Sequence, residues 1–80
     1  MQALILVRSN GKNAESLAER LVRINGVDNV MLLETREILV LLTFESTEGL
    51  TQAIRQIREA PGVQSTETKL VLSRLRGQKP

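Results

Sequence analysis

The chain has 80 residues, which makes one domain near the small end of what folds alone. Hydrophobic residues make up 41% and charged residues 25%, a composition typical of a globular domain and not of a disordered or membrane chain. The sequence has no Cys and no His, which excludes disulfides, thiolate or imidazole metal sites and His-based catalytic triads, and its net charge of +2 does not by itself suggest nucleic acid.

The N-terminal segment MQALILVRSNG does not read as a secretory signal, because no basic segment precedes its short apolar run. No stretch of the sequence approaches the length of a membrane span. We therefore expect a cytoplasmic protein with no membrane partner.

The first half of the chain predicts a strand, a helix and a second strand. Residues 2–8 form the first strand, which ends at the turn-forming cluster SNGK. Asn13 is placed to cap a helix that Asn25-Gly26 ends, and its apolar residues recur at helical spacing: Ala14, Leu17, Leu21 and Ile24. The second strand covers residues 29–34, and a charged turn of residues 35–37 follows.

The second half predicts the same three elements again. The third strand is the apolar run of residues 38–44. Ser46 or Thr47 caps the second helix, Pro61-Gly62 closes it, and its buried stripe consists of Leu50, Ala53, Ile54 and Ile57. Residues 65–75 form the fourth strand, and residues 76–80 are a basic tail that follows a single domain over residues 1–75.

This order of elements predicts an α+β fold of the ferredoxin-like βαββαβ type. Each helix ends in Gly-Val, and the two Gly-Val pairs, Gly26-Val27 and Gly62-Val63, lie 36 residues apart. Two similar strand-helix-strand halves with right-handed crossovers give a four-stranded antiparallel sheet with both helices on one face.

The other face of this sheet lacks the polar residues that a solvent-facing side should show at every second position. Leaving its leucines in water would forgo roughly 1.5–3 kcal/mol each, and a contiguous patch of this kind usually marks an interaction surface. We expect a second copy of the chain to cover it, sheet against sheet, in a homodimer or larger oligomer. The predicted interface residues are Leu4, Leu6, Leu39 and Leu41.

The polar residues do not form an evident catalytic or cofactor site. Most carboxylates fall on helical segments beside Arg or Lys, and the hydroxyl residues of the fourth strand have no base to activate them. An RNA-binding sheet needs aromatic residues for base stacking, and the only aromatic residue is Phe44. We therefore expect no enzymatic activity, no metal and no cofactor. The basic residues near the C-terminus, Arg74, Arg76 and Lys79, are interpreted as solubilising.

The segment PGVQSTETKLVLSRL, after an amphipathic helix, resembles the effector-binding (RAM) domain of the Lrp/AsnC transcription regulators. The resemblance extends upstream through residues 3–34 and covers about residues 2–75; Pro61-Gly62-Val63 followed by Thr66 and Thr68 is its strongest local mark. It implies domains that dimerise through their sheets and assemble further, with small-molecule sites at the interfaces. Co-assembly with full-length Lrp/AsnC regulators is one implied role.

Two features of the sequence differ from that family. Met1 leads straight into the first strand without a helix-turn-helix, so the chain resembles a stand-alone RAM protein, for which we expect no direct sequence-specific DNA binding. The family's Gly-Asp-Tyr-Asp turn, near which amino acids bind between dimers, is not retained. The matching positions are Thr35, Arg36, Glu37 and Ile38.

Those four positions form the predicted ligand site at a dimer–dimer junction. Arg36 would pair with the carboxylate of a free amino acid and Glu37 with its ammonium group. The alternative function is a protein- or peptide-binding module, like the small nitrate reductase chaperones that share this topology.

Overall fold

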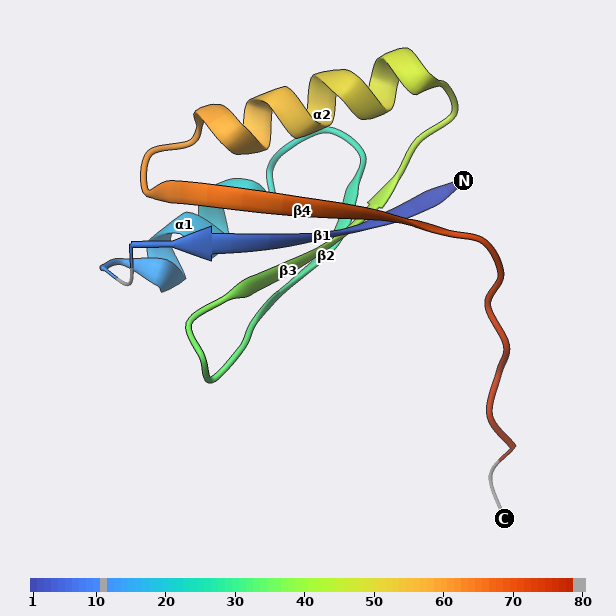
Figure 1. Cartoon of the computed structure of the whole chain (residues 1–80), viewed down its shortest axis with the longest axis horizontal. Coiled ribbons are helices and arrows are strands. Elements are labelled where there is room, and N and C mark those ends of the chain that lie inside the picture. Colours follow the sequence, from blue (N-terminus) through green and yellow to red (C-terminus); the bar gives the residue numbers. More distant parts are fainter. Residues whose placement is uncertain (11, 79–80) are drawn as a thin grey trace.

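The computed structural model describes residues 1–10 and 12–78. Four antiparallel strands and two helices follow one another in the predicted βαββαβ order (Figure 1). In chain order they are β1 (Gln2–Ser9), α1 (Ala14–Leu21), β2 (Val27–Leu32), β3 (Ile38–Thr43), α2 (Thr47–Glu59) and β4 (Val63–Val71). The sheet order is β2-β3-β1-β4, so β1 and β3 are central and β2 and β4 are edges. The predicted ferredoxin-like α+β fold is confirmed.

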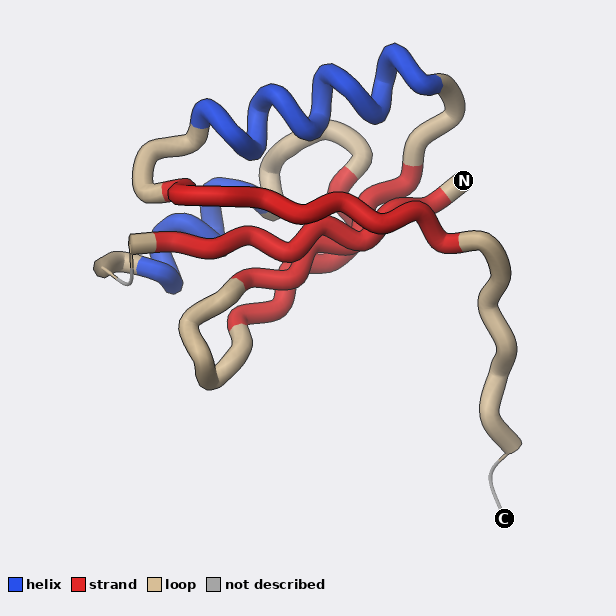
Figure 2. Tube along the Cα trace, in the orientation of Figure 1, coloured by secondary structure: helices blue, strands red, loops and turns tan. Residues whose placement is uncertain are grey.

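The core lies between the sheet and the two helices. Every second residue of β1 and β3 is buried there, and the helices add the apolar stripes that face them. The cluster comprises Ile5, Val7, Leu17, Leu21, Ile38, Val40, Leu42, Ala53 and Ile57. Both helices thus cover the same face, and the tube in Figure 2 shows no helix over the other face.

The two helices begin differently. Ser46 caps α2 as predicted, because its side chain accepts a hydrogen bond of 3.1 Å from the Gly49 N–H. Asn13 precedes α1 but does not cap it with its side chain: its backbone is left-handed, with φ of 57°, and no side-chain cap bond forms. Helix α1 also ends at Leu21, before the predicted last residue Ile24, which is partly buried against the core from the following turn.

Two strand boundaries differ from prediction. Strand β2 starts at Val27, because Val27 already pairs with Leu42 across an irregularity in the register, and it ends at Leu32. Strand β4 spans residues 63–71 where residues 65–75 were predicted, because its pairing with β1 ends where Gln2 meets Val71.

Residues 72–78, which we call the C-terminal arm, leave the sheet at that point and run away from the body (Figures 1 and 2). Gly11 of the first loop and Lys79 and Pro80 of the predicted basic tail lie outside the described residues.

Candidate functional site: the open face of the sheet

Four leucines occupy the centre of the sheet face that the helices leave open. The antiparallel register between β1 and β3 places Leu4 opposite Leu41 and Leu6 opposite Leu39, which are the four predicted interface residues. We call them the leucine strip. Each is partly buried by its neighbours, and Met31 on β2 extends the apolar surface beside Leu39 with 45% of its area exposed.

Polar side chains border this strip at one end and along β4. Arg8 and Glu37 form an ion pair at one end, with 3.3 Å between Arg8 Nε and Glu37 Oε2. Along β4, Lys69 and Glu67 form another ion pair of 3.3 Å, and the register places them opposite Leu4 and Leu6. The open face therefore has an apolar centre with a polar rim, the anatomy of a protein–protein interface.

The hairpin between β2 and β3 holds the predicted ligand positions. The Leu33 N–H donates to the Glu37 carbonyl at 2.8 Å, and the Arg36 N–H donates to the Leu33 carbonyl at 2.9 Å. Arg36 has a φ of 73°, so a left-handed residue ends a three-residue loop of a common hairpin type. This position favours Gly, and an Arg there adopts an uncommon backbone conformation.

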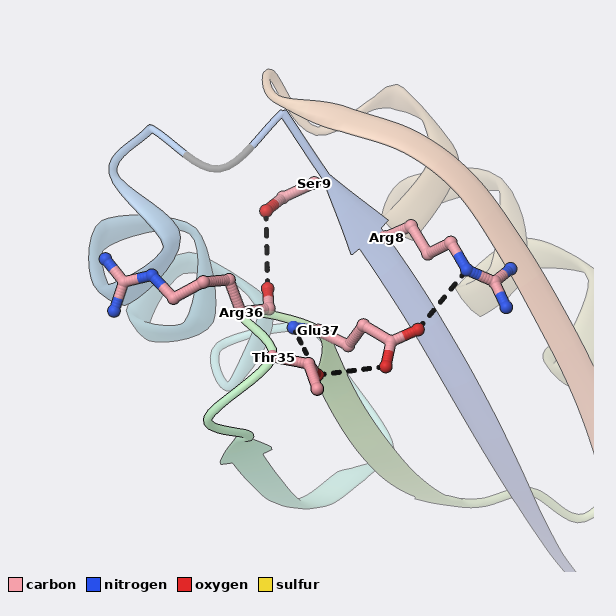
Figure 3. Close-up of polar contacts among 5 residues, drawn as sticks. All are labelled: Arg8, Ser9, Thr35, Arg36 and Glu37. Carbon is pink, nitrogen blue, oxygen red and sulfur yellow. Dashed lines mark hydrogen bonds and ion pairs between the residues drawn. The ribbon is translucent and has the colours of Figure 1, made fainter.

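The hairpin sends the Arg36 and Glu37 side chains in different directions (Figure 3). The Arg36 guanidinium extends to α1, where Nη1 lies 3.0 Å from Glu15 Oε1. The Glu37 carboxylate turns to the open face, where it pairs with Arg8 and accepts a 3.0 Å hydrogen bond from the Thr35 hydroxyl. The two charges assigned to one amino acid ligand are thus not aimed at a common point.

Ile38 is fully buried in the core, so its side chain is not available on the surface of the turn to contact a ligand. The Ser9 hydroxyl donates to the Arg36 carbonyl at 3.5 Å, which ties the end of β1 to the turn. The other three predicted positions, Thr35, Arg36 and Glu37, line a shallow depression of about 430 Å³.

The sequence interpretation of this site missed the residues that line the depression from other elements. They are Arg8, Ser9, Asn10 and Gln64. Arg8 is the most important of these because it provides the cation beside Glu37. A signal for it was present: pairing β1 with β3 so that Val7 meets Ile38 places Arg8 next to the start of the hairpin.

The described residues contain no cluster of three carboxylates arranged to hold a metal ion. Within residues 1–10 and 12–78, neither helix is long and apolar enough to cross a membrane.

The fold and the open face define a small ferredoxin-like α+β domain with an uncovered apolar sheet surface. No protein-family model and no curated protein matches the sequence. Solved structures match it closely in fold. A protein from Thermus thermophilus superposes with a TM-score of 0.83 at 24% identity, over 95% of this chain and 98% of that one.

Escherichia coli AsnC matches with a TM-score of 0.82 at 24% identity, over 99% of this chain but only 56% of its own length. The E. coli Tat proofreading chaperone NapD matches with a TM-score of 0.79 at 17% identity, over the whole of this chain and 85% of its own. These identities establish a shared fold. The predicted likeness to the domain of AsnC-type regulators is thereby confirmed in architecture.

Proposed function

We propose that the chain is a regulatory domain of the Lrp/AsnC type that self-associates by placing the leucine strips of two copies against each other. The observation that carries this proposal is the strip itself: four leucines in two cross-strand pairs at the centre of the open face. The fold shared with E. coli AsnC supports the regulatory assignment.

The arrangement of polar and apolar groups on this face supports self-association. The ion pairs Arg8–Glu37 and Lys69–Glu67 are already satisfied within one chain, so a partner need not supply charges to cover the strip. A second copy presents the same apolar centre and polar rim, and a two-fold axis through the strip makes the two surfaces self-complementary.

The variant Leu41→Lys tests this interface. It places an ammonium group at the centre of the strip, where burial without a partner charge is strongly unfavourable. We expect the unmodified protein to sediment as a dimer or larger oligomer at micromolar concentration, and Leu41→Lys to sediment as a monomer with an unchanged far-UV circular dichroism spectrum.

Thr51→Lys is the matched control, since Thr51 is an exposed residue of α2 in the helix layer, away from both the strip and the depression, and it should leave the mass unchanged. A folded, monodisperse monomer of the unmodified protein would contradict the proposal.

A free amino acid is the proposed effector, bound at the depression beside the hairpin. Arg8 and Arg36 supply cations there and Glu37 a carboxylate, although Arg36 now pairs with Glu15 and must leave it to contact a ligand. Both partners of that pair are largely exposed, so breaking it costs only about 0–1 kcal/mol. A neighbouring copy would have to enclose the depression, because an open surface leaves such contacts weak.

Calorimetric titration with each of the twenty amino acids tests this part of the proposal. We expect binding by the assembled protein, and a loss of binding in Arg36→Ala and in Leu41→Lys. Silence toward all twenty at millimolar concentration would leave a role in assembly alone, such as association with full-length Lrp/AsnC regulators.

The fold shared with NapD favours a second candidate, a module that binds a protein or peptide on the same open face. Such a module keeps its leucine strip free and stays monomeric until its target arrives. Sedimentation separates the two candidates before any ligand is known.

A further inference from the structure

The C-terminal arm exposes two leucines far more completely than any residue of the leucine strip. Leu72 is 96% exposed and Leu75 is 91% exposed. Arg74 and Arg76 lie between and after them, so the arm combines apolar and basic side chains. Single exposed leucines are ordinary, but two in one short segment that projects from the body make it a candidate for contact with a partner.

The arm starts at a corner of the open face. Val71, the last residue of β4, pairs with Gln2, which pairs on its other side with Thr43 at the end of β3. Neighbouring strands are about 4.8 Å apart, so the root of the arm lies about 10 Å from Thr43. The arm is thus continuous with the surface proposed to meet a second copy.

The same end of the sheet contains a pocket of about 440 Å³ between β2, β3 and the first turns of α2, which we call the end pocket. Leu42, Phe44 and Ala53 give it an apolar floor, and each is at least nine-tenths buried. Asp28 and Glu45 supply two carboxylates, while none of the lining residues is basic. Its chemistry therefore suits an apolar group joined to a cation.

The carboxylates of the end pocket can pair with a basic residue of a partner, because no basic residue of the described chain pairs with them. Glu15, Glu37 and Glu67 are each in an ion pair with a basic residue. Over residues 1–10 and 12–78, neither Asp28 nor Glu45 has such a partner; Asp28 accepts a hydrogen bond from the Thr43 hydroxyl.

We propose that the C-terminal arm of one copy docks in the end pocket of a second copy, with Leu75 over the apolar floor and Arg74 or Arg76 beside Asp28 and Glu45. This inference rests on the proposed self-association through the open face. Leu75 lies four residues beyond Val71, and four extended residues span about 13 Å, which exceeds the roughly 10 Å between two sheets packed face to face.

The arm's own pocket is the less suitable acceptor. In Figures 1 and 2 the arm runs away from α2, which forms one wall of the end pocket. To enter it, the chain would have to turn back toward α2 after Val71, and residues 72–78 contain no turn in the structure.

Cysteine cross-linking tests the contact cleanly, because the sequence has no cysteine of its own. Leu75→Cys and Gln52→Cys, the latter in the wall of the end pocket, are prepared as separate single variants, mixed in equal amounts and oxidised. We expect the mixture to give more covalent dimer on a non-reducing gel than either variant oxidised alone. Glu59→Cys is the matched control, since it lies on the same helix two turns, or about 10 Å, farther along and outside the end pocket.

The double variant Leu75→Cys/Gln52→Cys distinguishes exchange from closure. Intermolecular docking gives covalent dimers, whereas a monomer with an internal disulfide would overturn the assignment to a second copy. Cross-linking no greater than with Glu59→Cys would overturn the docking itself. If sedimentation still shows a dimer in that case, only the arm inference fails; a monomer in sedimentation removes the proposed function as well.

Charge reversal provides an independent readout. Arg74→Glu or Glu45→Lys should each weaken the dimer by about fivefold in dissociation constant, the upper range for an exposed ion pair, and the double variant should recover most of the loss. Additive losses in the double variant would show that these two residues do not meet.

Discussion

Among the glycines that the structure describes, Gly26 is the one with the least room for an added side chain. Its φ is +93°, and a Cβ added there would lie 2.9 Å from the Thr43 carbonyl oxygen and 3.2 Å from Leu42 Cδ1. The Gly26 carbonyl also accepts the Thr43 N–H at 2.9 Å, so the two segments cannot separate without losing that bond. We expect Gly26→Ala to lower the free energy of unfolding by about 2–4 kcal/mol, because backbone strain and steric overlap add.

Urea denaturation followed by circular dichroism measures this change, as the chain has no Trp or Tyr to serve as a fluorophore. Gly62→Ala is the matched control for strain alone: its φ is +98°, but the nearest atom to an added Cβ is 3.9 Å away. It should cost less than Gly26→Ala. Equal losses would show that close approach to Thr43 contributes nothing.

Arg36 shows why the candidate site was only partly predictable from the sequence. Residues 35–37 were correctly placed in a charged turn between two strands. The left-handed conformation of Arg36, which directs its guanidinium to Glu15 on α1, depends on the hydrogen bonds that close the hairpin and on the position of α1. Neither can be inferred from the residue types in the turn.

At the scale of elements, the two helices offer a comparison between a capped and an uncapped start. The Ser46 side chain satisfies the Gly49 N–H in α2, whereas Asn13 makes no side-chain cap bond in α1. We expect Ser46→Ala to destabilise the fold by about 1 kcal/mol. Asn13→Gly should cost nothing or raise stability slightly, because Gly adopts the left-handed backbone of residue 13 without strain.

Thermal unfolding of both variants compares the two helix starts directly. A loss in Asn13→Gly as large as that in Ser46→Ala would contradict the absence of a side-chain cap at Asn13.

Most element positions followed from the apolar residues, which recur at helical spacing in the two helices and form continuous runs in β1 and β3. The end of β4 did not. Leu72 and Leu75 continue the apolar pattern past the sheet, but a strand also needs a partner, and β1 pairs with β4 only as far as Val71. Whether a strand continues depends on its partner as well as on its own residues. The apolar pattern of residues 65–75 alone therefore predicted a fourth strand that extends too far.

At the scale of the whole molecule, the positive charge is dispersed. Arg8, Arg36 and Lys69 are neutralised by carboxylates of the same chain. We expect this chain to bind duplex DNA only weakly and without sequence preference, in a manner that high salt abolishes.

Fluorescence anisotropy with a labelled duplex, repeated at low and physiological salt, measures the affinity of the chain for duplex DNA. The expected result is the same weak binding for unrelated sequences. Selection of one sequence over random duplex at physiological salt would contradict the prediction.

The pairing of Gln2 with Val71 has a consequence for how the chain could be rewired. It places the two ends of the domain side by side on adjacent strands, so a short linker could join them and new termini could be opened in the exposed hairpin between β2 and β3. Such a circular permutant retains every strand neighbour of the sheet while making β3 the first strand and β2 the last. We therefore expect the fold to form whichever of its two βαβ halves comes first in the chain.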